Sequence, residues 1–234
     1  MVILDALKAW VESVPENIRL YRDHRRAYRP GIYELYMCYF TCIITFFHVC
    51  GHAIRSTTTS LASLVASSCI ARLTEELDHR DDINYMTSIN NWYLMVATVP
   101  LIHYEGSHMD YGGTCTEELE IIVRALKQMQ LKWPQTTTIL NTVERLRRSK
   151  GDGGSSAMSH VFVPAIHSGE RDHLSMESLL ELFPFPPSMC PRMGLFENVV
   201  TTQCSISTSQ SADLGALDNF GWIFDEWFEM AHAS

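Results

Sequence analysis

Titratable side chains are most densely grouped in residues 103–110, where His103, Glu105, His108 and Asp110 lie within eight positions. Imidazoles and carboxylates at this spacing could form a facial metal triad or an acid/base pair for proton transfer. The same residue types are common in solvated turns, and a glycine and a serine lie among them. Two hypotheses therefore stay open for this segment: a catalytic site made by these four residues, or an exposed loop.

Two further pairs have the four-residue spacing that places side chains on one face of a helix. His48 and His52 could reach one metal ion, but no glutamate of an H-E-x-x-H motif and no third ligand stand nearby. We interpret them as polar residues at the end of a packed helix and expect neither a metal site nor a cofactor. Cys38 and Cys42 lie in an apolar stretch, which favours two core residues.

Three established catalytic motifs are absent from the sequence. The chain contains no G-x-x-x-x-G-K-[ST] loop, no G-x-G-x-x-G turn after a strand and no G-x-S-x-G elbow. We therefore predict that the protein is not an enzyme.

The last part of the chain alternates acidic residues with large hydrophobic ones. Between Asp213 and Glu229 five acidic residues are interleaved with Phe220, Trp222, Phe224, Trp227 and Phe228. This pattern is typical of activation segments, in which charge keeps the aromatic side chains exposed until a partner groove buries them. A final helix docked on the core needs the same amphipathic pattern, so both interpretations stay open.

The net charge of −9 is confined to one end of the chain. Residues 1–150 hold 16 basic and 16 acidic side chains, whereas residues 151–234 hold 2 basic and 11 acidic ones. An acidic end repels phosphate, so we expect no direct binding of nucleic acid by this chain. The seven cysteines form an odd number without a C-x-x-C pair, which indicates a reducing compartment, and the first residues do not resemble a secretory signal.

Apolar residues recur at helical spacing through the first 150 residues, and no strand alternation is found. The pattern predicts an all-α fold, an irregular multi-helix bundle over residues 1–150 whose central helix begins near Ile32. Pro100 should kink or end a helix over 85–99, residues 103–114 should form a loop, and Glu117, Glu118 and Glu120 should occupy the first turn of the next helix. An uncharged run over residues 35–54 has the length of a membrane span, but a central helix of a helical domain gives the same signal, and we predict no membrane insertion.

A change in composition follows Lys150. The run Gly151-Asp-Gly-Gly-Ser-Ser is typical of a flexible break. We predict a linker or irregular region over residues 151–214, with one short helix near residues 175–182. An acidic and aromatic amphipathic helix is predicted over residues 215–234.

The order of these elements resembles the regulatory region of fungal-specific transcription factors, the all-helical middle homology region found downstream of a binuclear zinc cluster. The resemblance covers residues 4–149 and is carried by residues 10–15, 34–48, 66–72, 91–97, 119–134 and 140–146. The family's second segment commonly ends in Arg-Pro, whereas Val49 and Cys50 follow His48 here. The six cysteines of the zinc cluster are absent, so the chain is not expected to bind DNA in the family's way. The family's regulatory region is usually longer upstream, so the chain is expected to correspond to the C-terminal half of that region.

The resemblance implies a nuclear, non-catalytic protein that regulates transcription, for example of a metabolic gene cluster for secondary metabolism. It implies contacts with the transcription machinery or with a DNA-binding regulator, and it leaves room for a small-molecule ligand and for a homo-oligomer. The alternative is an enzyme on the same helical scaffold, such as a cofactor-independent isomerase or cyclase, with the four residues between 103 and 110 as its site.

Overall fold

The structure is a computed structural model that describes residues 2–20, 28–50, 57–105, 112–151, 176–186, 188–190 and 192–194. Its α-helices are α1 (Val2–Ser13), α2 (Pro30–Cys50), α3 (Thr57–His79), α4 (Asn90–Tyr104), α5 (Gly112–Gln130), α6 (Thr136–Gly151) and α7 (Met176–Leu180), with short 3-10 helices η1 (Glu16–Ile18) and η2 (Asp82–Tyr85). Of the described residues, 79% are helical and none lies in a strand, which confirms the predicted all-α class. The helix predicted over residues 215–234 lies outside the described residues.

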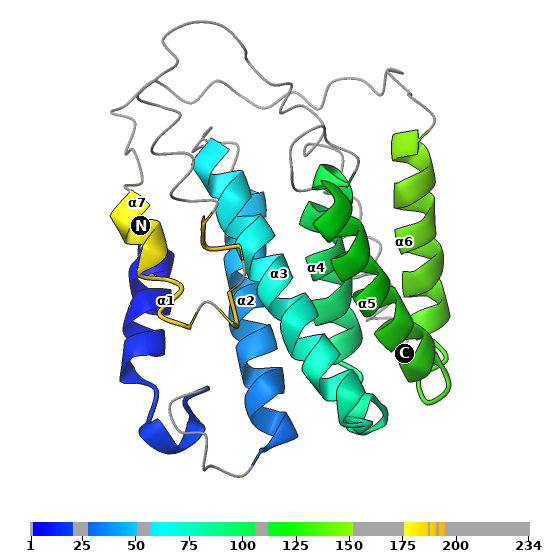
Figure 1. Cartoon of the computed structure of the whole chain (residues 1–234), viewed down its shortest axis with the longest axis horizontal. Coiled ribbons are helices and arrows are strands. Elements are labelled where there is room, and N and C mark those ends of the chain that lie inside the picture. The colour runs from blue at the N-terminus through cyan, green and yellow to red at the C-terminus, as the bar shows by residue number, and fades with distance from the viewer. Residues whose placement is uncertain are drawn as a thin grey trace, which may run out of the picture.

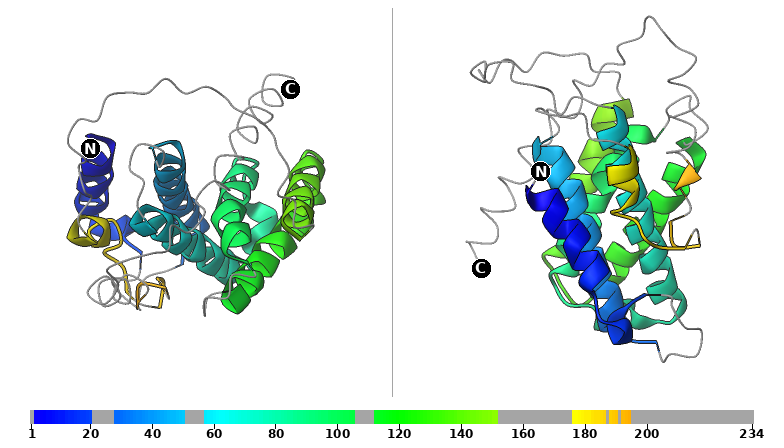
Figure 2. Two further views of the ribbon diagram at one scale, coloured as in Figure 1. Left: turned by 90° about the horizontal axis from the view of Figure 1, so that it is seen from above. Right: turned by 90° about the vertical axis from the view of Figure 1, so that its left-hand side faces the viewer.

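The first six helices lie beside one another across the molecule in chain order (Figure 1). Seen from above, they form two rows, with α2, α4 and α6 in one row and α3 and α5 in the other (Figure 2). Each helix from α2 to α5 therefore packs against its successor and also against a helix two places along the chain. This zigzag buries an apolar face on each helix from α2 to α6, because each of these has neighbours in both rows.

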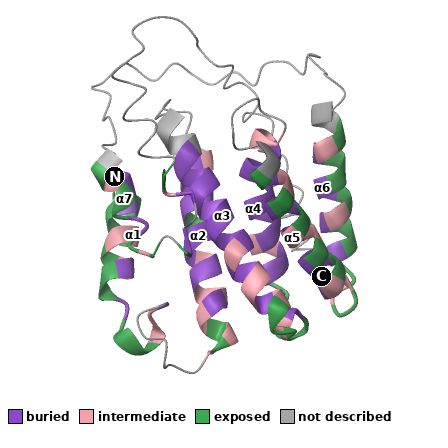
Figure 3. Ribbon diagram, in the orientation of Figure 1, coloured by how far each residue is buried: buried purple, intermediate pink, exposed green. Residues whose placement is uncertain are grey.

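The apolar spacing of residues 32–47 predicts one buried stripe on α2, which is confirmed from Tyr36 onward, whereas Ile32 and Leu35 are half-buried. Burial is complete or nearly so for Tyr36, Tyr39, Phe40, Ile43, Ile44 and Phe47. These residues recur at steps of three and four, so they share one face of the helix. Part of that face packs against α1, through Trp10 on Tyr36 and Tyr39, and the opposite side of α2 carries most of its less buried positions (Figure 3).

The centre of the domain is α3 and not the predicted helix from Ile32. α3 packs against α2, α4 and α5, and every described residue from 61 to 71 in it is buried. Many of these side chains are small, for example Ala62, Ala66 and Ala71, and each is fully buried. Small side chains let three neighbouring helices approach closely. The sequence pattern favoured α2 because its large aromatic residues give the stronger apolar signal.

The boundaries of α4 also differ from the prediction. Residues 82–85 form η2 instead of the start of α4, after Asp81 reverses the chain at a φ of 59°. Aspartate tolerates this left-handed conformation better than most residues. α4 then runs from Asn90 through Pro100 to Tyr104, so Pro100 does not end it. Pro100 removes one backbone hydrogen bond, but the continuous burial of residues 94–102 stabilises the helix on both sides of it.

The loop predicted over residues 103–114 is therefore shorter. α4 extends to Tyr104 and α5 begins at Gly112. The early start of α5 moves Glu117, Glu118 and Glu120 out of the first turn into the second and third turns. Their position is thus not explained by the positive end of the helix dipole, and Glu118 is buried.

One helix within the described part of the chain is long and apolar enough to cross a membrane, by length and composition alone. It is residues 30–48 of α2, and more than half of that stretch is buried inside the protein. The core helix of a helical domain passes the same test, so this feature by itself is weak support for a membrane span.

Candidate functional site

The structure describes two of the four residues predicted as an acid/base or metal site. His103 and Tyr104 end α4, with their rings edge to face at 5.0 Å, and Glu105 caps the helix. Both carboxylate oxygens of Glu105 accept hydrogen bonds from Arg147 of α6, at 2.6 Å from Nη2 and 3.2 Å from Nε. His108 and Asp110 lie outside the described residues. The ion pair gives Glu105 a structural role, which is to hold the end of α4 against α6.

The cysteine pair on α2, Cys38 and Cys42, does not lie in the core as predicted. Cys38 is half-buried and Cys42 is exposed, so neither is a core residue. A step of two residues turns about 200° around a helix. Cys38 and Cys42 stand two residues before and after the buried Phe40, so they lie away from the apolar stripe. His48 is half-buried in the last turn of α2, and His52 lies outside the described residues.

The Cys38 thiol is held in an unusual electrostatic environment. A hydrogen bond from Cys42 and a second one from Tyr93 of α4 outweigh its burial and lower the pKa of Cys38 to about 6. Hydrogen bonds to a thiolate favour the charged form. Cys38 is therefore expected to react as a thiolate at neutral pH, whereas an ordinary thiol has a pKa of about 8.5.

We expect iodoacetamide to alkylate Cys38 with a rate that falls as the pH falls through about 6, because protonation removes the nucleophilic thiolate. Tandem mass spectrometry across the range between about pH 5 and 9 measures the midpoint at each cysteine. Replacing Cys42 by alanine removes the main donor and should move the Cys38 midpoint upward. Tyr93→Phe should move it in the same direction by less. A midpoint near 8.5 for Cys38 in the unsubstituted protein would show that this thiolate is not stabilised.

The aromatic residues predicted to bind a partner, Phe220, Trp222, Phe224, Trp227 and Phe228, all lie outside the described residues. The part of the chain before them is better defined. Residues 176–186, 188–190 and 192–194, here called the C-terminal strap, pack against the helical domain although they belong to the region predicted as a linker or irregular segment. The predicted short helix in this region corresponds to α7.

The strap begins on α1 and then crosses α2. At α1, Lys8 Nζ donates to Ser178 Oγ at 2.6 Å and pairs with Glu181 at 2.7 Å. At α2, the Tyr39 hydroxyl donates to the Leu182 carbonyl at 2.8 Å. These contacts hold the first part of the strap against α1 and α2.

Aromatic packing covers the next part of the strap. The Phe183 ring stacks on Phe40 with centroids 6.2 Å apart, and Phe185 meets the edges of Phe40 and Tyr36 at 5.4 and 5.5 Å. Such pairs add about 0.5–1.5 kcal/mol to the burial of their surfaces. The strap therefore completes the apolar face of α2 rather than lying loosely on it.

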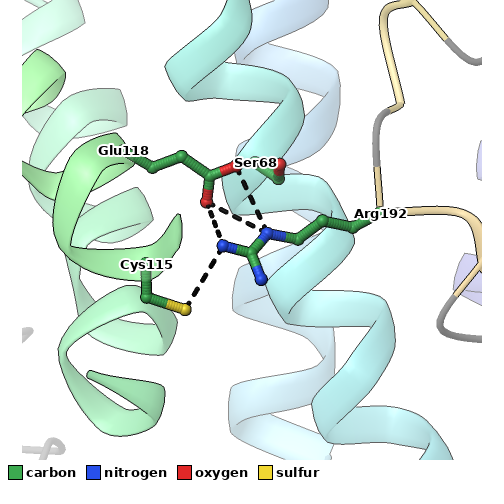
Figure 4. A network of polar contacts seen from close by, with 4 residues as sticks. All are labelled: Ser68, Cys115, Glu118 and Arg192. Carbon is green, nitrogen blue, oxygen red and sulfur yellow. Dashed lines mark hydrogen bonds and ion pairs between the residues drawn. The ribbon is translucent and has the colours of Figure 1, made fainter. Parts of the chain in front are cut away.

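A buried ion pair anchors the end of the strap (Figure 4). The guanidinium of Arg192 donates from Nη2 to Glu118 Oε2 at 2.8 Å and from Nε to both carboxylate oxygens at 3.1 and 3.2 Å. The Ser68 hydroxyl of α3 donates to Glu118 Oε1, and the Cys115 sulfur lies 3.4 Å from Arg192 Nη2. The side chains of Arg192 and Glu118 are only 6% and 10% exposed. The network therefore joins the strap, α3 and α5 at one buried point.

The charges at this point are compensated. Burial alone would lower the pKa of the Arg192 guanidinium, but hydrogen bonding and attraction by Glu118 raise that pKa overall. Arg192 therefore stays protonated. A buried charge that loses its partner is strongly destabilising. Replacing either Arg192 or Glu118 alone should therefore destabilise the fold far more than replacing both.

Two signals in the sequence point to this anchor, although neither identifies it. Cys115, Glu118, Ile122, Ala125 and Met129 follow one another at steps of three and four, so the glutamate falls on the buried stripe of α5. Arg192 is also the last Lys or Arg of the chain. Nothing in the sequence shows that residues 74 positions apart are partners.

Comparisons with known proteins found no relative of this chain. No family model, no curated protein and no solved structure matches it.

Proposed function

We propose that this chain is a non-catalytic, nuclear regulatory protein: a helical domain that controls transcription through contacts with other proteins. The observation that supports the proposal is the anchoring of the strap by the buried ion pair between Arg192 and Glu118, to which Ser68 donates a hydrogen bond. The acidic and aromatic segment follows this anchor in the chain. The ion pair fixes the point from which the chain continues toward that segment, so we expect a ligand or partner that shifts α3 or α5 to move this point.

The carboxylates of Glu105 and Glu118 are paired with other side chains of the domain, which favours a protein that acts by binding partners over an enzyme. An acid/base residue needs a carboxylate that can reach a substrate, whereas both oxygens of Glu105 are engaged by Arg147. The carboxylate of Glu118 is likewise engaged by Arg192 and Ser68. These groups stabilise the domain and join its parts.

The aromatic side chains of the C-terminal segment should supply the binding energy for a partner, and the acidic ones solubility and steering. A fusion of residues 211–234 to a foreign DNA-binding domain is therefore expected to activate a reporter gene. Replacing Trp222, Trp227 and Phe228 by alanine should abolish this activation. Replacing Asp225 by asparagine and Glu226 by glutamine should weaken it less.

The interpretation as a docked helix predicts the opposite pair of results. The fusion of residues 211–234 would be inert, and the aromatic substitutions would lower the melting temperature of the whole chain. An inert fusion together with a destabilised full-length variant would make this segment structural and would refute the activation role.

A further inference from the structure

A second contact between the strap and the helical domain joins two sulfur atoms. Cys69 Sγ of α3 lies 3.0 Å from Cys190 Sγ of the strap, and the two residues are 121 positions apart in the chain. Both are almost completely buried, at 0% and 1% exposure. Both are free thiols in this structure.

The surroundings of this pair favour a bond between the sulfurs. A disulfide needs the two sulfur atoms at about 2.05 Å, so the thiols would have to approach by about 1 Å. Cys69 lies within the regular hydrogen bonding of α3, whereas Cys190 follows a turn in the non-helical part of the strap, where its main chain makes two hydrogen bonds, to the Pro186 carbonyl and from the Met193 amide. Arg192, two residues further on, holds that part of the strap against α5. The anchor therefore keeps Cys190 beside Cys69 without covalent help.

We propose that Cys69 and Cys190 are a site of reversible disulfide formation that locks the strap onto α3. This inference goes beyond the proposed regulatory function and does not depend on it, because it rests on the position of the two thiols and on the Arg192–Glu118 ion pair and needs no regulatory role. The oxidant is a small-molecule disulfide, and glutathione disulfide serves as the probe for this class.

The chemistry is two successive thiol–disulfide exchanges. The Cys190 thiol loses its proton, and the thiolate attacks one sulfur of glutathione disulfide, which releases one glutathione thiolate and leaves a mixed disulfide. The Cys69 thiolate then attacks the Cys190 sulfur, forms the Cys69–Cys190 bond and releases the second glutathione thiolate. The protein loses two protons and two electrons, and one glutathione disulfide is reduced to two glutathione molecules.

Burial controls how fast the exchange starts. It raises the pKa of the Cys69 thiol well above its usual value, and the hydrogen bond with Cys190 raises it further. The thiolate is the attacking species, so the docked pair is protected. Reaction therefore begins when the strap lifts and both thiols meet solvent, and re-docking brings the second sulfur into place.

Formation of the Cys69–Cys190 bond is tested in the full chain. The protein is equilibrated in glutathione redox buffers and quenched with acid, and its tryptic peptides are mapped by mass spectrometry. Cleavage after Lys and Arg yields peptides 56–72 and 172–192, each of which contains a single cysteine. We expect these two peptides to be linked in the oxidised protein. Because the bond closes a loop of 121 residues, the unfolding temperature should rise by roughly 10 °C.

Variants separate this pair from the other thiols. Cys69→Ser and Cys190→Ser should each abolish the linked peptides and the rise in unfolding temperature, whereas Cys42→Ser should leave both unchanged. The proposal would be overturned if the unsubstituted protein showed only reduced thiols, only glutathione adducts or a Cys69–Cys115 bond. This measurement on the unsubstituted protein does not require any variant to fold. A Cys69–Cys190 bond without a higher unfolding temperature would overturn the locking of the strap.

Discussion

Replacing Arg192 by methionine should lower the free energy of unfolding by about 3–5 kcal/mol, because it leaves the carboxylate of Glu118 buried without its cationic partner. Ser68 supplies one remaining hydrogen bond, which does not neutralise the charge. Urea denaturation followed by circular dichroism measures the change. Limited proteolysis should also cut residues 176–194 faster, since the anchor of the strap is lost.

Two further proteins make this experiment specific to the buried pair. The double variant Glu118→Met with Arg192→Met removes both charges, and its stability should return to that of the unsubstituted protein or exceed it. Arg148→Met breaks an ion pair in α6 whose members are 75% and 59% exposed, and it should change stability by less than about 1 kcal/mol. If Arg192→Met were as mild as Arg148→Met, the ion pair would not anchor the strap.

Replacing Phe40 by alanine should cost about 3–5 kcal/mol from lost burial and from the cavity left behind. Phe40 is fully buried in α2 and packs against Phe183 and Phe185 of the strap. Thermal unfolding and urea denaturation measure the loss, and Phe47→Ala, at 4% exposure, should behave in the same way.

The matched control for the aromatic variants is an apolar side chain that the fold leaves exposed. Leu131 after α5 is 87% exposed, so Leu131→Ala should change stability by no more than about 0.5 kcal/mol. Thermal unfolding that barely moves for both phenylalanine variants would mean that α2 is not part of the core. The interpretation of α2 as a membrane or surface helix would then gain support.

Periodicity in the sequence was sufficient for the all-α class and for most helix faces. The spacing from Tyr36 to Phe47 and the run of Leu119, Ile122, Leu126 and Met129 on α5 both correspond to buried residues. This success has a local cause, since steps of three and four residues place side chains on one helix face whatever covers that face. The resemblance to fungal transcription factors and the roles of the C-terminal aromatic residues remain predictions.

The errors lie where a neighbour in space decides the outcome. Pro100 lies inside α4, where residues 94–102 are all buried, so it does not end that helix, and Cys42 is exposed although it lies in an apolar stretch of the sequence. Residues such as 176–194, with two phenylalanines among prolines, lack a period, so the sequence pattern favoured an irregular segment there.

The sequence by itself therefore determined the all-α class, the buried stripes of α2 and α5 and the place where the charge of the chain is concentrated. Only the tertiary structure decided that α3 is the central helix, that the strap covers α1 and α2, and that Glu118 is the partner of Arg192. Apolar periodicity is a property of one helix, whereas an ion pair across 74 residues or a thiol contact across 121 depends on how the whole chain is arranged in space.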